Sequence, residues 1–180
     1  QVFSIQGNFG GRHAHRKDIK GTVSCLRGLE EEDSKFGGGK AVHLDLIGHV
    51  VGGKNSLDTG SLKRGKVNII ADLSSTDYYN AIADTHFMIV AVAEKDYFCC
   101  RATSSVPAAL ITGTPLVAQR SFLKYYPCLN EAPVHKLIAK DTECESIEAA
   151  HKLTKEQYLQ ARHEMANCSA TFYSEARDLW

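Results

Sequence analysis

Three hydroxyl side chains gather before an apolar segment in the middle of the chain. Thr103, Ser104 and Ser105 directly precede residues 106–110, which carry Pro107 in their first turn. Hydroxyl residues followed by proline are typical of a helix N-terminus. Unpaired backbone N–H groups and a partial positive charge at such an end favour an anion. The sequence therefore predicts that Thr103, Ser104 and Ser105 bind a phosphate.

A second candidate phosphate site follows the first strand that the sequence predicts, residues 2–6. It is rich in glycine and ends in basic side chains: Gly7, Asn8, Gly10, Gly11, Arg12 and Lys17. Glycines let backbone N–H groups approach an anion, and basic side chains add positive charge and donors. The spacing departs from the G-x-G-x-x-G pattern, so a surface turn with solvated charges is an equal alternative.

The elements that must position these residues alternate along the chain. Apolar runs predict six strands, at residues 2–6, 42–47, 67–71, 87–92, 115–118 and 134–139. Helices are expected over 18–32, 74–83, 103–113 and 120–126, and two more follow capping boxes at Thr142 and Thr154. This alternation predicts an α/β fold, a doubly wound parallel sheet with helices on both faces.

In such a fold, ligands bind at the carboxyl ends of the strands. Three predicted loops meet there: residues 7–17, residues 48–49 and residues 94–105. We therefore expect the two candidate phosphate sites to face one crevice and to attract one anionic ligand. Tyr78 and Tyr79 can stack on a sugar ring, although aromatic pairs at helix ends more often serve packing.

The order of these elements resembles a known family of enzymes. The glycine turn with its basic helix, Leu46-Ile47-Gly48 and the stretch 74–79 precede Ala-Leu-Ile-Thr-Gly-Thr-Pro-Leu-Val at 109–117. Together they look like the C-terminal, nucleotide-sugar-binding half of a retaining GT-B glycosyltransferase. The resemblance covers nearly the whole chain as architecture. Only the 109–117 segment and the first glycine turn match as motifs.

The resemblance implies roles for particular residues. Arg12 and Lys17 would bind the donor diphosphate, with Arg16 as a rival. The loop after the fourth strand would hold the sugar, through Glu94, Asp96 and Tyr97. Glu94, Lys95 and Asp96 can also be a catalytic cluster, and a solvated loop is the alternative for these charged residues. Ala108 stands where the family carries a second glutamate, and the acceptor-binding half of the fold is absent from this chain.

Three functions follow as alternatives. The first is a glycosyltransferase donor domain that is catalytically incomplete alone. The second is a free-standing, lectin-like carbohydrate-binding protein derived from a transferase-like precursor. The third is a structural or interaction domain with a vestigial site. In each case we expect a single domain over residues 1–180, a nucleotide sugar or carbohydrate as ligand, and neither cofactor nor metal.

Composition limits the remaining classes. The 21 basic and 21 acidic residues cancel, which argues against a nucleic-acid partner. No apolar run approaches the roughly 20 residues of a membrane span. The six cysteines form no CxxC or zinc-finger pattern: Cys25, Cys99, Cys100, Cys128, Cys144 and Cys168. Reduced thiols in a cytoplasmic protein are therefore favoured over disulfides, which remain the alternative.

Overall fold

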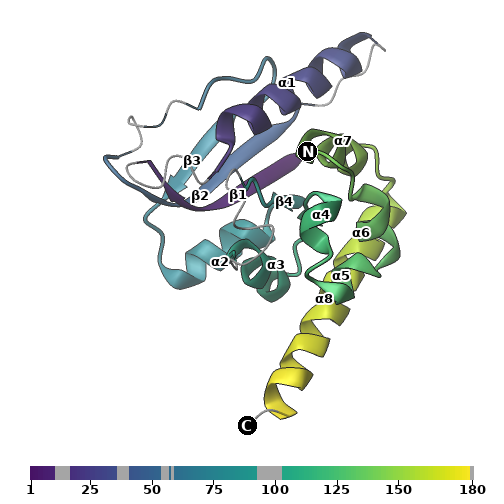
Figure 1. The fold of residues 1–180 in the computed structure, drawn as a ribbon. Helices are drawn as coiled ribbons and strands as arrows, with labels where there is room; N and C mark the ends of the chain where they lie inside the picture. Colours follow the sequence, from purple (N-terminus) through teal and green to yellow (C-terminus); the bar gives the residue numbers. More distant parts are fainter. Residues whose placement is uncertain (11–16, 36–40, 54–56, 58, 93–102, 179–180) are drawn as a thin grey trace.

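A parallel five-stranded sheet forms the centre of the protein (Figure 1). The computed structural model describes residues 1–10, 17–35, 41–53, 57, 59–92 and 103–178. The strands are β1 (Val2–Phe9), β2 (His43–Val50), β3 (Val67–Ala71), β4 (Phe87–Ile89) and β5 (Leu116–Val117). They lie in the order β3-β2-β1-β4-β5. The order reverses between β1 and β4, as in a doubly wound fold.

Helices cover both faces of this sheet, which confirms the predicted fold class (Figure 1). They are α1 (Ile19–Lys35), α2 (Ser75–Ala83), α3 (Ser105–Thr112), α4 (Arg120–Leu123), α5 (Pro127–Asn130), α6 (Pro133–Ile138), α7 (Glu143–His151) and α8 (Lys155–Asp178). Figure 1 shows the C-terminal end of α8 projecting beyond the other helices. None of the helices that the described residues form is long and apolar enough to cross a membrane.

The sheet is buried on both faces, because apolar side chains of its strands pack into one core on each face. Strand β1 adds apolar side chains to the first core alone, and its buried Ser4 and Gln6 alternate with them. On one face, Phe3 and Ile5 pack with Leu26 of α1. On the other, Ile47 and Met88 pack with α2, α3 and the later helices. Burial of one such large side chain contributes about 1.5–3 kcal/mol. The continuous apolar runs in the sequence therefore predict buried parallel strands correctly.

Several helix ends have the chemistry that the sequence predicts. The Thr142 hydroxyl accepts from the N–H of Glu145, and the Glu145 carboxylate accepts from the N–H of Thr142, which completes a capping box at α7. Thr154 and Gln157 exchange the equivalent bonds at α8. Gly113 ends α3 at φ 65°, a left-handed conformation that glycine adopts readily.

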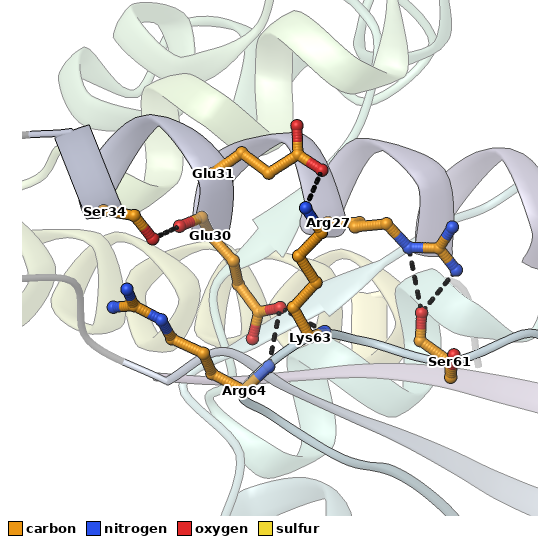
Figure 2. A network of polar contacts seen from close by, with 7 residues as sticks. All are labelled: Arg27, Glu30, Glu31, Ser34, Ser61, Lys63 and Arg64. Carbon is orange, nitrogen blue, oxygen red and sulfur yellow. Dashed lines mark hydrogen bonds and ion pairs between the residues drawn. The ribbon is translucent and has the colours of Figure 1, made fainter.

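Helix α1 is held onto the segment before β3 by the polar network in Figure 2. The buried Glu30 carboxylate accepts from the backbone N–H groups of Lys63 and Gly65, both at 2.7 Å, and of Arg64 at 3.1 Å. Burial alone would raise the pKa of Glu30, but these bonds outweigh it and the pKa falls below its ordinary value. Arg27 donates to the Ser61 carbonyl, and Lys63 pairs with Glu31 at 2.7 Å. The network fixes the C-terminal half of α1 against the segment that precedes β3.

The sixth strand, expected over residues 134–139, is wrong: these residues form α6. Pro133 occupies the first turn, where its missing N–H costs nothing. The Glu164 carboxylate accepts from the N–H groups of Val134 and His135, at 3.0 and 3.2 Å. Val134 and Ile138 are both buried, a spacing of four residues that suits one face of a helix.

The first and fourth strands also differ in length from the sequence prediction. Strand β1 continues through Gly7 to Phe9, so the glycines expected in a turn begin inside the sheet. Gly7 pairs with Gly48 of β2. Regular pairing of β4 ends at Ile89, and Val92 instead forms an isolated bridge with Lys17. This bridge places Lys17 beside the end of the fourth strand.

The expectation of reduced cysteines is wrong for four of the six. Cys25 of α1 is bonded to Cys144 of α7, and Cys128 of α5 is bonded to Cys168 of α8. Their Cα atoms lie 5.6 and 5.3 Å apart. The spacing in sequence, 119 and 40 residues, gave no local pattern by which to recognise the pairs. Cys99 and Cys100 lie outside the described residues.

Candidate functional site

A cavity of about 500 Å³ opens at the carboxyl ends of β1, β2 and β3. Its walls come from these three strand ends, the first turns of α2 and the residue before α3. The lining residues are Gln6, Gly7, Asn8, Gly48, His49, Asp72, Leu73, Ser75, Tyr78, Tyr79 and Ser104. The cavity therefore lies at the edge where a doubly wound fold binds its ligands.

Gln6 connects the wall of this cavity to the start of α3. The Gln6 side-chain amide donates to the hydroxyls of Ser104 at 2.9 Å and Ser105 at 3.0 Å. Its carbonyl oxygen accepts from the Tyr78 hydroxyl at 2.6 Å. Burial raises the pKa of Tyr78 to about 12, so this hydroxyl stays protonated and remains a donor. The network fixes both serines relative to β1 and α2.

Lys17 reaches the same serines from the start of α1. Its Nζ donates to the Val90 carbonyl at 2.6 Å and to the Ser105 hydroxyl at 3.2 Å. A Cβ at Gly7, which lines the cavity, would lie 3.5 Å from Lys17 Cε, so this side chain packs close to the cavity wall. Burial lowers the pKa of Lys17 to about 8, against a smaller opposing effect of Glu143. Lys17 is still mostly a cation at pH 7.

Glu143, at the first position of α7, is the acidic group coupled to Lys17. The Thr22 hydroxyl donates to its carboxylate at 2.9 Å. Burial raises the pKa of Glu143 to about 7, more than this hydrogen bond and the Lys17 charge lower it. Near neutral pH the Glu143 carboxyl is therefore only partly ionised. The negative charge of Glu143 therefore neutralises the Lys17 ammonium group only in part at this pH.

The start of α3 differs from the backbone anion site that the sequence predicts. The N–H of Ser105 is already bonded to the Thr103 hydroxyl at 3.3 Å, and Pro107 has no N–H. Ser104, the N-cap residue, makes no capping hydrogen bond with its side chain among the described residues. Its exposed hydroxyl lines the cavity instead. Side chains, more than backbone amides, supply the donors here.

His49 and Asp72 form a hydrogen-bonded pair at the rim of the cavity. The His49 Nδ1 atom lies 2.8 Å from Asp72 Oδ1, and both side chains are largely exposed. They directly follow Gly48 and Ala71, which are paired across β2 and β3. Asp72 has φ 59°, a left-handed conformation that is uncommon outside glycine. Its N–H donates to the Gly48 carbonyl at 3.1 Å, which holds this turn.

The structure brings part of the predicted site together. Gly7, Asn8 and Ser104 line the cavity, and Lys17, Thr103 and Ser105 join them through the hydrogen-bond network. Gly10 follows β1 at φ 78° and is not among the lining residues. Gly11 and Arg12, with the rival Arg16, lie outside the described residues. The same holds for the predicted sugar-binding residues, Glu94, Asp96 and Tyr97.

The sequence prediction placed His49 in a loop at the ligand-binding edge but gave its side chain no role, and it missed four lining residues: Gln6, Asp72, Leu73 and Ser75. His49 lies near the end of β2 and Asp72 directly follows β3, and these positions at the carboxyl edge of the sheet could have indicated both residues. The sequence alone indicates no more for Gln6 than a place in the first strand. Its contact with Ser104 depends on which face of the sheet its side chain occupies. One group of possible metal ligands, Cys25, Cys144 and Glu148, has both sulfurs joined in a disulfide and offers no thiolate.

Comparison with known proteins gives similarity in fold alone. No protein-family model matches the chain, and no curated protein matches it in sequence. A solved structure described as the basis for EarP-mediated arginine glycosylation of translation elongation factor EF-P matches with a TM-score of 0.53 and 15% identity. The match covers 98% of this chain and 60% of that one.

The N-terminal domain of Candida albicans trehalose-6-phosphate phosphatase matches with a TM-score of 0.52 and 9% identity, over 95% of this chain and 38% of that one. A structure provisionally described as a UDP-N-acetylglucosamine 2-epimerase from Listeria monocytogenes matches with a TM-score of 0.49 and 15% identity. This match covers 90% of this chain and 39% of that one. The chain thus spans less than two thirds of each of these three matched chains. The first two matches, each with a TM-score above 0.5, support the parallel α/β fold that the sheet order shows and indicate nothing beyond the fold.

Proposed function

We propose that the cavity binds the diphosphate of a nucleotide sugar, and that the chain acts as the donor-binding part of a GT-B-like glycosyltransferase. One observation carries this proposal. Ser104 lines the cavity, and Lys17, which packs against Gly7, bonds to the adjacent Ser105. A cation, a hydroxyl donor and a glycine wall therefore meet at the carboxyl edge of the sheet, where an anion would be bound.

The electrostatics of Lys17 favour an anionic ligand. Its ammonium group is partly removed from water, and this desolvation disfavours the charged form. A phosphate oxygen near Ser104 would provide the opposite charge that Glu143, only partly ionised at neutral pH, does not fully provide. In a transfer reaction the same groups would stabilise negative charge on the departing diphosphate.

The proposal limits what the chain does alone. In this proposal the lining residues bind and orient a donor. The resembling family carries a glutamate at the position of Ala108, and none of the described lining residues replaces that carboxylate with a glutamate. The sugar acceptor would be held by another domain. The GT-B-like fold, shared with the EarP structure, is compatible with sugar transfer, but at 15% identity it specifies neither sugar nor acceptor.

Calorimetry with UDP and GDP tests the proposal. Wild-type protein is expected to bind at least one of them, and Lys17→Met is expected to weaken binding tenfold or more, because a charge-assisted hydrogen bond contributes about 1.5–3 kcal/mol. Ser104→Ala should weaken it less. Lys136→Met, a change at an exposed lysine of α6, is the matched control and should leave binding unaltered.

Two results would contradict the proposal. One is the absence of heat and of thermal stabilisation with either nucleotide at millimolar concentration. The other is nucleotide binding that Lys17→Met and Lys136→Met leave equally unchanged. A folded Lys17→Met variant, checked by its circular dichroism spectrum, is required for the second result to count.

A further inference from the structure

We infer that His49 and Asp72 bind a pair of neighbouring hydroxyl groups on the ligand, so that the cavity has a phosphate end at Ser104 and a sugar end at the rim of β2 and β3. This inference rests on the proposed function, because it assigns the remaining part of the same ligand. Its two observations are the hydrogen-bonded His49–Asp72 pair and the tyrosines beside it.

The pair has the donor and acceptor pattern that a vicinal diol requires. Asp72 Oδ1 is engaged by His49 Nδ1 at 2.8 Å, and each side chain has a second polar atom, Oδ2 and Nε2. A carboxylate oxygen accepts from one hydroxyl, and a ring nitrogen donates to or accepts from its neighbour. Both residues are anchored by paired strand ends, Gly48 and Ala71, so their spacing is fixed by the sheet.

The backbone at Asp72 is consistent with a functional position. Asp72 lies at φ 59°, where a side chain is disfavoured and glycine is not. Such conformations gather at ligand-binding sites, where the surrounding structure maintains them. A turn that served only to connect β3 to α2 would be more stable with glycine here. A carboxylate retained at this position is consistent with a role in ligand binding.

Aromatic side chains form the adjoining wall. Tyr79 is 37% exposed, and its ring lies 5.2 Å from that of Tyr78 in an edge-to-face arrangement. Tyr78 is fixed in turn by its bond to Gln6. An amphipathic ring beside a carboxylate suits a sugar, whose C–H faces are apolar and whose edges carry hydroxyls.

The charges set the direction of the ligand. The Asp72 carboxylate repels a phosphate, whereas Lys17 and Ser104 attract one. A nucleotide sugar contains diols on both sides of its diphosphate, in the ribose and in the transferred sugar. Either can fill the His49–Asp72 end, and the chemistry of recognition is the same for both.

Calorimetry with matched ligands distinguishes the ribose diol from the diol of the transferred sugar. The probes are UDP, 2′-deoxy-UDP and UDP-glucose, with GDP, 2′-deoxy-GDP and GDP-mannose as the second series. The variants are Asp72→Asn and His49→Ala, and the control is Asp84→Asn at the exposed far end of α2. We expect Asp72→Asn to weaken binding about tenfold or more, and Asp84→Asn to have no effect.

The pattern of losses identifies the diol. A loss seen with UDP and absent with 2′-deoxy-UDP assigns the ribose, and a loss confined to UDP-glucose assigns the transferred sugar. Either result supports the inference. Unchanged binding of all six ligands in Asp72→Asn and His49→Ala, while Lys17→Met abolishes binding, would overturn it and leave the proposed function standing.

Two further measurements keep the test decisive. If no nucleotide binds, the proposed function fails, and NMR titration of the His49 ring with methyl glucoside decides the inference: a saturable shift, lost in Asp72→Asn, supports it, and no shift overturns it. Asp72→Gly should raise the melting temperature while weakening ligand binding. A lower melting temperature with unchanged binding would assign Asp72 a structural role and count against the inference.

Discussion

Lys17 Nζ lies 3.2 Å from the Ser105 hydroxyl, and this contact joins residues 88 apart in the sequence. It is the point where the two stretches that the sequence marks as phosphate-binding meet. Because Ser105 is also bonded to Gln6, and Gln6 to Tyr78, a change at any of the four is transmitted to the cavity wall.

The close approach of Gly7 and Gly48 can be tested by substitution. A Cβ at Gly48 would overlap the Gly7 carbonyl oxygen, and Gly48 has φ 150°, a conformation that other residues rarely adopt. Gly48→Ala should therefore destabilise the protein by several kcal/mol, on the order of 3. Gly28→Ala on α1, where a Cβ meets no atom within 4 Å, should stabilise it by about 0.5–1 kcal/mol.

Urea denaturation of the two glycine variants measures both effects. Equal stability of Gly48→Ala and wild type would contradict the tight pairing of β1 with β2 at this point. It would also contradict the position of Gly7 and Gly48 in the cavity wall.

Ionisation of Glu143 should make stability depend on pH. Burial raises the folded-state pKa of this carboxyl to about 7, above its ordinary value of 4.5. The resulting stability is fully present below pH 4.5 and is lost as pH rises from 4.5 through 7. Glu143→Gln keeps the size and the Thr22 hydrogen bond without the charge. It should thus be more stable than wild type above pH 7 and equal to it near pH 4.5.

Denaturation midpoints at pH 4.5, 6 and 8 give this comparison, with the exposed Glu32→Gln on α1 as control. A constant difference between Glu143→Gln and wild type across the three pH values would show that the carboxyl does not titrate between 4.5 and 7.

A second buried acid, Glu164 of α8, should give stability the opposite pH dependence to that of Glu143. Although burial alone would raise its pKa, the His135 side chain and the N–H groups of Val134 and His135 lower it below 4.5. The stability it supplies is present above pH 4.5 and is lost as pH falls through the lowered value. Glu164→Gln places an amide donor against these donors, so it should destabilise the protein by about 3 kcal/mol at pH 7.

The control for Glu164 is Glu131→Gln, an exposed acid on the α5–α6 connection. Thermal unfolding at pH 7 compares the two variants. A Glu164→Gln melting temperature as high as that of the control would rule out the carboxylate as the cap of α6.

The two disulfides predict which cysteine-containing peptides remain joined after digestion. Digestion without reductant should yield Cys25 joined to Cys144 and Cys128 joined to Cys168. Replacing Cys25 and Cys144 together by serine should lower stability by roughly 3–5 kcal/mol, since the bond closes a long loop in the unfolded chain. Alkylation of all four as free thiols in the folded protein would contradict the pairing.

Local chemistry explains which parts of the structure the sequence predicts. Apolar runs locate the five strands, and the hydroxyl and glycine signals at Thr142, Thr154 and Gly113 locate helix ends, because these depend on neighbouring residues alone. Residues 134–139 mislead, because an apolar stretch of six suits either element. The carboxylate that decides for a helix, Glu164, lies 30 residues away.

The candidate site shows the same division. Glycines at the end of β1, basic residues after them and hydroxyls before α3 are recognisable by type, so Gly7, Lys17 and Ser104 were predicted. The role of Gln6 depends on which way a strand residue faces. The His49–Asp72 pair depends on the order of β2 and β3 in the sheet, and the disulfides depend on the packing of α1 with α7 and of α5 with α8. None of these relationships is local in sequence.

The titration of Lys17 with and without UDP tests the central claim most directly. NMR of ¹³C-lysine protein, assigned with Lys17→Met, should show the Lys17 Cε signal titrating at about 8 in the free protein. A bound diphosphate favours the ammonium form, so saturating UDP or GDP should raise this midpoint by one unit or more. A midpoint that stays near 8 with the nucleotide bound would place the anion elsewhere and contradict the account.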